Sequence, residues 1–298
     1  MKVLSLRAML LVLPVMSFAA CSTEPKAQPE EPVTAAAAAA AVPAPVLPAT
    51  IEEAITSEFR TPQNKERDAY RHPLETLKFF GLEPGMRVIE VSPGKGWYSE
   101  IIAPLLTAKG EFLPAVQDPG NSEYMQKAVG AYKEWFAAKP TVKATFIPFE
   151  LGAPLVVTEP VDMVLTFRNV HNWMSQNKAQ EAFKSFFVAL KPGGILGVVE
   201  HRADPKKKQD PKGKSGYVKE SEVIRMATAA GFKLDAKSEI NANPKDTKDY
   251  PDGVWTLPPS LSKGDADRQK YIDIGESDRM TLRFIKPVTL KKPTKATK

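Results

Sequence analysis

The sequence predicts an α/β protein with a doubly wound, mainly parallel sheet, and three observations support this prediction. Short apolar runs alternate with amphipathic stretches along most of the chain. An apolar run over residues 86–91 is followed by a glycine-rich turn and a second apolar-periodic stretch. Later, a Pro-Gly-Gly turn at 192–194 separates an amphipathic stretch from a continuous apolar run, as a buried parallel strand requires.

The expected elements follow in order along the chain. Residues 51–80 have a helical pattern that ends at Gly81, a residue suited to a helix C-cap. The clearest helix lies over 179–190, where apolar residues recur at intervals of three and four. We expect three further helices, over 97–106, 122–138 and 220–230. We expect strands over 86–91, 111–117, 142–149, 161–167, 195–201, 232–240 and 280–285.

The last two expected strands have no recognisable helix between them. A parallel neighbour in a sheet needs a crossover connection, which is usually helical. We therefore expect the final strand to run antiparallel to its neighbours.

The N-terminal segment has the pattern of a secretory signal. Lys2 and Arg7 precede a short apolar run that ends in small residues at 17–20, and the run is too short to span a bilayer. Cys21, the only cysteine in the sequence, follows at once, and the residues up to it resemble a bacterial lipobox, in which the cysteine is lipidated. By resemblance to Gram-negative lipoproteins, Ser22 favours delivery to the outer membrane. An ordinary cleaved signal with an incidental cysteine is the alternative.

Three segments are expected: a signal peptide over 1–20, a lipidated cysteine with an alanine- and proline-rich tether over 21–51, and one large α/β domain over 52–298. The localisation expected from them is periplasmic, with a lipid anchor in the outer membrane. Because the chain has no second cysteine, it cannot form an intramolecular disulfide in an oxidising compartment.

The formal net charge of the chain is +6 at pH 7, and much of this excess is local. It comes from a lysine-rich loop and a lysine-rich tail, at Lys206, Lys207, Lys208, Lys212, Lys214, Lys291, Lys292, Lys295 and Lys298. Such runs are usually solvated surface, and attraction to anionic lipid headgroups is the functional alternative. The sequence has neither zinc-finger spacing nor a basic region with dimerising heptads, which argues against a nucleic-acid partner.

Residues 90–99 read Glu-Val-Ser-Pro-Gly-Lys-Gly-Trp-Tyr-Ser. This stretch resembles motif I of class I S-adenosylmethionine (SAM)-dependent methyltransferases, with Ser92 in place of the first glycine of their pattern. Other segments match in order, at 67–73, 162–173, 190–194 and 229–232. The resemblance implies a doubly wound, Rossmann-like, seven-stranded sheet with an antiparallel last strand. The segment at 67–73 also looks like a branch of predicted exported methyltransferases whose substrate is unknown.

The resemblance implies that the cofactor SAM lies against the carboxyl ends of the first three strands. Gly94 and Gly96, after Ser92, are expected to approach its methionyl part through their backbone. Glu90 is expected to bind the ammonium group of the cofactor, or else to interact with the start of the next helix.

Three more residues are expected at the cofactor. Asp118 would accept the ribose hydroxyls, with Gln117 as the alternative register and a turn in Asp118-Pro119-Gly120 as the structural alternative. Glu150 would lie near the adenine amino group, and Asn169 would contact the cofactor from the loop after the fourth strand.

His171 is the candidate catalytic residue, as a general base, and orientation of its loop is the alternative role. Trp173, His201 and Tyr70 are candidate substrate contacts. Their alternative roles are core packing for Trp173, strand termination for His201 and helix capping for the segment of Tyr70. No metal site is expected.

The leading hypothesis is a SAM-dependent methyltransferase that acts on an unidentified small-molecule or envelope acceptor. The main alternative is a non-catalytic small-molecule-binding protein on the same fold, which Ser92 and the scarcity of SAM outside the cytosol favour. A nicotinamide-dependent oxidoreductase is a third hypothesis, against which the expected antiparallel strand argues. A P-loop is excluded because Gly94-Lys95 is followed by Gly96. The oligomeric state is not predicted.

Overall fold

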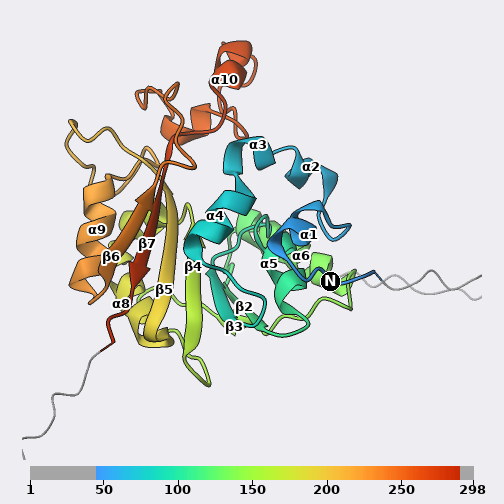
Figure 1. Cartoon of the computed structure of the whole chain (residues 1–298). Helices are drawn as coiled ribbons and strands as arrows, with labels where there is room; N and C mark the ends of the chain where they lie inside the picture. Colours follow the sequence, from blue (N-terminus) through green and yellow to red (C-terminus); the bar gives the residue numbers. More distant parts are fainter. Residues whose placement is uncertain (1–44, 289–298) are drawn as a thin grey trace, which may run out of the picture. The chain divides into compact units, whose positions relative to one another are not determined.

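The computed structural model describes residues 45–288 and shows a sheet with helices on both faces (Figure 1). The predicted signal, Cys21, most of the tether and the C-terminal lysines lie outside the described residues. The strands of the described region form one sheet in the order β3-β2-β1-β4-β5-β7-β6. Their bounds are β1 Arg87–Val91, β2 Glu111–Val116, β3 Ile147–Pro148, β4 Val161–Phe167, β5 Leu190–His201, β6 Lys233–Ser238 and β7 Arg279–Ile285.

The direction of β7 confirms the expected antiparallel last strand. It lies between β5 and β6 and pairs antiparallel with both, whereas the pairs among β1 to β5 are parallel. The sheet is therefore seven-stranded and mixed, as predicted.

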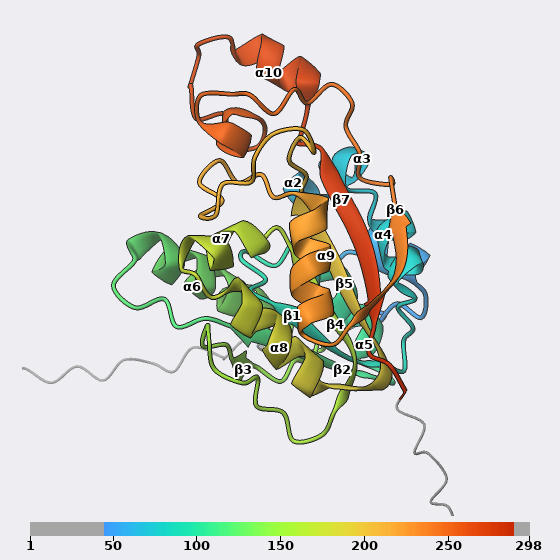
Figure 2. The same cartoon turned by 90° about the vertical axis from the view of Figure 1, so that its left-hand side faces the viewer.

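Each face of the sheet has its own apolar core. The helices of one face are α7 Val170–Ser175, α8 Ala179–Ala189 and α9 Glu220–Ala229 (Figure 2). The helices of the other face are α1 Ile51–Thr56, α4 Pro73–Phe80, α5 Ser99–Leu106 and α6 Glu123–Ala137. Successive side chains of a strand point to opposite faces, so Ile89 of β1 joins the first core and Val88 joins the second.

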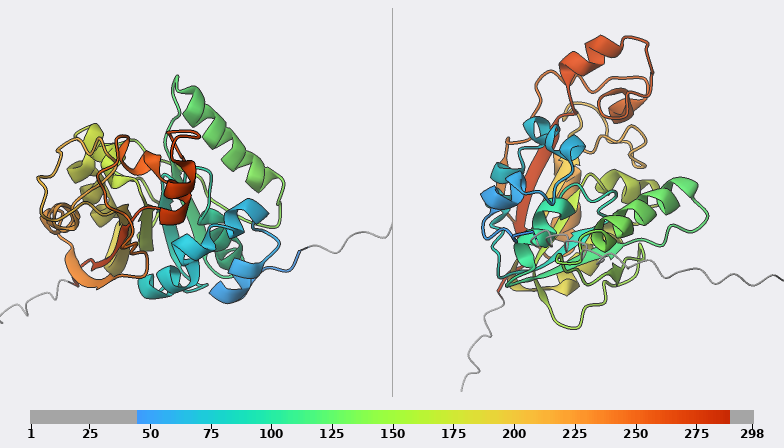
Figure 3. Two further views of the ribbon diagram at one scale, coloured as in Figure 1. Left: turned by 90° about the horizontal axis from the view of Figure 1, so that it is seen from above. Right: turned by 90° about the vertical axis from the view of Figure 1, so that its right-hand side faces the viewer.

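The remaining helices lie beyond the edge of the sheet at which β5 ends. They are α2 Pro62–Lys65, α3 Asp68–Arg71, the 3-10 helix η1 Gly253–Thr256 and α10 Arg268–Ile274. Figure 3 shows α10 with its flanking loops (orange) and the N-terminal helices (blue) from two further directions. In the part of the chain that the structure describes, no helix is long and apolar enough to cross a membrane.

Three expectations for the elements were wrong in extent. The predicted helix over 51–80 consists of four short helices, because Pro62 and Pro73 each begin a new helix and His72 between them has a φ of 41°. The predicted strand over 142–149 is only the two residues of β3, whose Pro148 cannot donate a ladder hydrogen bond. The connection between β6 and β7 contains η1 and α10, although no helix was expected there.

Candidate functional site

A cavity of about 650 Å³ opens at the carboxyl edge of the parallel strands. In open α/β sheets this edge is the usual place for ligands, and the volume suits a small-molecule site. Its walls come from the loop after β1, the residues after β4, the end of β5, the α2–α3 region and the connection between β6 and β7. The lining residues used below are Arg67, Arg71, Ser92, Gly94, Trp97, Arg168, Asn169, His171, His201, Trp255, Glu276 and Ser277.

The loop after β1 is open toward the cavity. Ser92 and Gly94 have φ values of 49° and 62°, and a Cβ at Gly94 would meet no atom within 4 Å. The hydroxyl of Ser92 is buried and has no hydrogen-bond partner within the described residues. Ser92 thus keeps the left-handed backbone that glycine usually supplies, and its hydroxyl, unpartnered by any described residue, is a polar group beside the cavity.

Asn169 holds this loop in place. Its amide Nδ2 donates to the carbonyl oxygen of Val91 at 3.0 Å and lies 3.4 Å from that of Ser92. Gly96, by contrast, serves packing, because a Cβ there would lie 2.6 Å from the ring of Tyr132 on α6. The predicted loop residues therefore divide into two that are open to the cavity, Ser92 and Gly94, and two that fix the loop.

Glu90 is buried beside α5 and α6 and lines a small recess next to the cavity rather than the cavity itself. Its carboxyl group accepts a 2.5 Å hydrogen bond from the hydroxyl of Ser99, the first residue of α5, and that hydroxyl lies 2.9 Å from the hydroxyl of Tyr132. Burial raises the pKa of Glu90 to about 8, against the weaker opposing effect of the Ser99 hydrogen bond. This contact corresponds to the second of the two roles expected for Glu90, an interaction at the start of the next helix.

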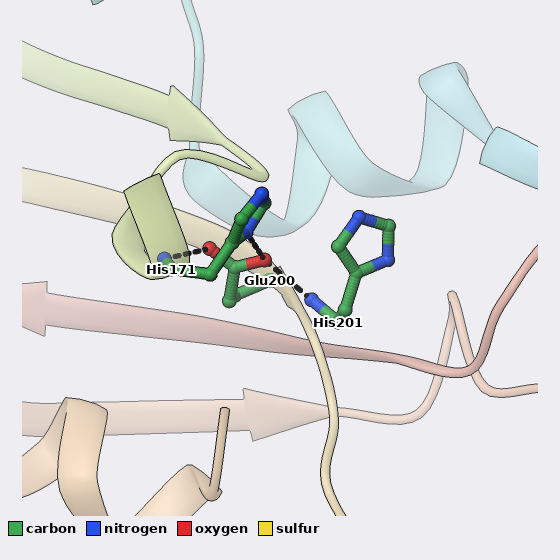
Figure 4. A group of neighbouring side chains, drawn as sticks. All are labelled: His171, Glu200 and His201. Atoms are coloured by element: carbon green, nitrogen blue, oxygen red, sulfur yellow. Dashed lines mark hydrogen bonds and ion pairs between the residues drawn. The ribbon is translucent and has the colours of Figure 1, made fainter. Parts of the chain in front are cut away.

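His171 and Glu200 form a buried pair on the opposite wall (Figure 4). Nδ1 of His171 lies 3.0 Å from Oε1 of Glu200, whose side chain has no exposed surface. The backbone N–H groups of His201 and His171 also donate to this carboxylate, at 2.8 and 3.3 Å. An ionised Glu200 favours the tautomer in which Nδ1 of His171 carries the proton, and Nε2 is then free to accept one.

His201 lies beside this pair, with its ring centroid 5.5 Å from that of His171. Its Nδ1 is 2.5 Å from the hydroxyl of Ser277. Burial, followed by the nearby His171 and arginines, lowers the pKa of His201 well below its usual value, so the ring is neutral at pH 7.

His171, Glu200 and His201 offer possible ligand atoms within 4.8 Å of one another, so we tested whether they fit a metal ion. The carboxylate of Glu200 already accepts hydrogen bonds at both oxygens. A metal that used Glu200 as a ligand would have to compete with these hydrogen bonds. The arrangement fits a hydrogen-bonded pair for proton transfer better than a metal centre.

Four arginines surround a single carboxylate at the third wall. Glu276 pairs with Arg67, Arg71 and Arg279 at 2.6, 3.3 and 3.1 Å. Burial would raise the pKa of Glu276, but the arginines outweigh it and lower that pKa to about 2. Arg168, which follows β4 with a φ of 63°, completes the group, and burial lowers its pKa to about 10.

The structure brings together Ser92, Gly94, Asn169, His171 and His201, all predicted from the sequence, on one cavity. Asp118 and Glu150 are not among the residues that line it, and both are exposed. The carboxylate of Asp118 accepts a hydrogen bond from the N–H of Gly120 at 2.9 Å, which is the turn that was its structural alternative.

Two candidate substrate residues lie elsewhere. Trp173 is 2% exposed and packs among Phe149, Phe183 and Phe186 in the core, so we no longer assign it to the substrate. Tyr70 is half-exposed and lines a separate, smaller recess. Its helix α3 contributes Arg71 to the main cavity instead.

Sequence reasoning missed Arg168, Glu276 and Ser277. Arg168 carried a usable signal, since it is the first residue after β4 at the edge where ligands bind. Glu276 and Ser277 carried none, because they follow α10, a helix that the apolar pattern did not predict.

Comparison with known proteins identifies the class of fold. No family model matches the chain, and no curated protein matches it by sequence. Among solved structures, a SAM-dependent methyltransferase from Aquifex aeolicus is similar, with a TM-score of 0.50 and 17% identity over 80% of this chain and 98% of that chain. The cyclase SpnF is similar with a TM-score of 0.52 and 16% identity over 78% and 85% of the two chains.

These similarities, together with the strand order, show that the chain has the class I methyltransferase fold. They do not fix the reaction, because one neighbour bears the name of a methyltransferase and the other that of a cyclase. The reaction has to be argued from the cavity.

Proposed function

We propose that this protein is a SAM-dependent methyltransferase. The observation that carries the proposal is one cavity with an open glycine turn on one wall and a carboxylate-oriented histidine on the other. The turn after β1 is where this fold seats a nucleotide-like cofactor. The histidine lies where an acceptor molecule would meet that cofactor.

The residues at the turn fit the methionyl half of SAM. Gly94 leaves open space above its backbone, and the buried hydroxyl of Ser92 has no protein partner among the described residues. Both features favour close approach of a polar ligand. Asp118 and Glu150, which were expected at the adenosine half, do not line the cavity.

SAM supplies a methyl group bonded to a positively charged sulfur. When bound, it would offer this methyl group to an acceptor oxygen, with the carbon–sulfur bond breaking as the oxygen–carbon bond formed and the electron pair returning to sulfur. His171 takes the proton of the acceptor hydroxyl at Nε2, and Glu200 stabilises the resulting imidazolium through Nδ1. Placement of the two reactants in one cavity supplies the remaining catalytic effect.

The acceptor, in our proposal, is a molecule of the cell envelope. The predicted signal and lipobox around Cys21 support an exported, membrane-anchored protein. The exposed side chains of Lys206, Lys207 and Lys208 are compatible with a nearby anionic surface.

A non-catalytic binding protein is the second candidate function. It is favoured by the positions of Asp118 and Glu150, which do not line the cavity although the SAM hypothesis expects them at the ribose and the adenine. Such a protein would use the same cavity for a ligand without a purine nucleoside.

Titration of the full chain with SAM and with S-adenosylhomocysteine tests the proposal. Gly94→Val places a side chain in the open space of the turn, and we expect it to weaken binding by about tenfold or more. Gly81→Val is the matched control, because Gly81 also has a positive φ and open space but lies at the C-cap of α4. Equal SAM affinity of the two variants would show that SAM does not bind at this turn.

A further inference from the structure

The arginine cluster carries more positive charge than the protein neutralises. Glu276 pairs with Arg67, Arg71 and Arg279, so one carboxylate faces three guanidinium groups. Arg168 adds a fourth. Glu200, which is hydrogen-bonded to His171, brings at most one more negative charge, and burial raises the pKa of Glu90 to about 8, so the four guanidinium groups still outnumber the nearby carboxylates.

Two of these arginines line the cavity and have guanidinium nitrogens without a partner among the described residues. Arg71 is 1% exposed, and its Nη2 has no hydrogen-bond partner in the described part of the chain. The guanidinium of Arg168 also lines the cavity and forms neither an ion pair nor a hydrogen bond with any residue between 45 and 288. Within the described region, Arg71 is paired only through the Glu276 carboxylate that three arginines share, and Arg168 is partly exposed at the cavity, so both guanidinium groups can take an anionic partner.

The proposed cofactor does not supply the missing negative charge. SAM carries one carboxylate, one ammonium group and one sulfonium group, so its net charge is positive at neutral pH. Its binding would leave the cavity more positive than before. An anionic second ligand would supply the counter-charge that SAM as a whole does not bring.

We infer that the methyl acceptor carries an anionic group, a carboxylate or a phosphate, which binds to Arg168 and Arg71. This inference rests on the proposed methyltransferase function and names the substrate class for it. Arginine suits the task, since its planar fork binds either anion through two parallel hydrogen bonds. Arg168 also lies three positions before His171, so an anion held there places the rest of the acceptor beside the proposed base.

The same arginines would alternatively hold the carboxylate of SAM itself. The two arrangements differ in one measurable respect. If the anion site belongs to the acceptor, a simple anion binds together with the cofactor. If it belongs to SAM, the anion and SAM compete.

Calorimetric titration of the full chain with inorganic phosphate and with acetate, with and without saturating S-adenosylhomocysteine, tests the inference. We expect saturable binding of at least one anion in both conditions. Arg168→Gln should weaken it by about tenfold or more, and Arg168→Lys, which keeps the charge but loses the fork, by less. Arg225→Gln is the matched control, since it removes the same charge from an exposed position on α9.

In this titration the inference would be overturned by no saturable anion binding, by equal affinity in Arg168→Gln and Arg225→Gln, or by competition between the anion and S-adenosylhomocysteine. The failure of the proposed function is a separate result, the absence of SAM binding in the same samples. Arg168→Gln is expected to fold, because the guanidinium that it removes has no partner among the described residues, and its thermal unfolding midpoint should match that of Arg225→Gln.

A second pair of probes separates the sources of the anion. Glycerol 1-phosphate represents a soluble acceptor, and vesicles of phosphatidylglycerol in phosphatidylcholine represent a lipid headgroup. If Arg168→Gln weakens the binding of either probe, the inference is supported and the source of the anion is identified. If both probes bind and Arg168→Gln changes the affinity of neither, the inference is contradicted.

Discussion

Glu200 fixes the chemistry of His171 as well as its position. Its carboxylate contacts both the ring and the backbone of His171, so the ring has one orientation and one favoured tautomer. The geometry therefore supports the role of a base for His171 and a positioning role for Glu200.

His171→Ala should lower the rate of methyl transfer by about a hundredfold or more while SAM affinity changes little, because the proton acceptor is lost and the cofactor wall is intact. Glu200→Gln should lower the rate less, since the ring keeps a hydrogen-bond partner but loses the stabilising charge. The measurement is radiolabelled methyl transfer from SAM into an envelope extract, beside SAM titration.

Asn172→Ala, an exposed change on the same helix α7, is the control for this pair. It should leave both the rate and the affinity unaltered. If His171→Ala reduced rate and affinity equally, the side chain would be structural.

At the scale of elements, Glu90 joins β1 to α5 and α6 through Ser99 and Tyr132. Its folded pKa of about 8 lies above the ordinary value of 4.5. Between these pH values the folded state holds a proton that the unfolded state lacks. The contribution of Glu90 to stability is therefore full below about pH 4.5 and is lost as the pH rises toward 8.

Glu90→Gln should remove this dependence, because an amide keeps the hydrogen bond to Ser99 and does not titrate. The free energy of unfolding of the natural chain, relative to the variant, should fall by about 2–5 kcal/mol between pH 5 and pH 8. Urea unfolding at the two pH values measures it. Parallel pH profiles would show that Glu90 is ionised in the fold.

Elements with a strong periodic pattern were predicted well. The strand over 161–167 agrees with β4 in both bounds, and the helix over 179–190 agrees with α8 within one residue. The failures have local causes. Proline at 62 and 73 divided the N-terminal helix, and α7 and α10 are too short for a periodic pattern to identify.

The candidate site was predictable where it follows strand ends and unpredictable elsewhere. Gly94, His171 and His201 each follow or end a strand, so the parallel sheet alone brings them to one edge. Glu276 reaches the same cavity through the connection between β6 and β7, whose path depends on tertiary packing. The charge balance of the cavity could therefore not be predicted from the sequence.

At the scale of the whole molecule, ligand binding should increase the free energy of unfolding. A ligand that binds only the folded state at a hundred times its dissociation constant adds about 2.7 kcal/mol. For a domain of this size, SAM should therefore raise the thermal unfolding midpoint by roughly 5–10 °C, whereas NADH should not. Thermal unfolding of the full chain with each ligand is the measurement. A larger shift with NADH would favour the oxidoreductase hypothesis.

The insertion of β7 between β5 and β6 also sets the order in which the chain can fold. Within the described residues, β6 pairs with no strand other than β7. The sheet therefore stays incomplete during synthesis until residues 279–285 have left the ribosome. Pairings between such distant segments form slowly. For a chain that we propose is exported, this delay has a use, because a polypeptide without its final strand is still loose enough to be threaded through a translocation channel.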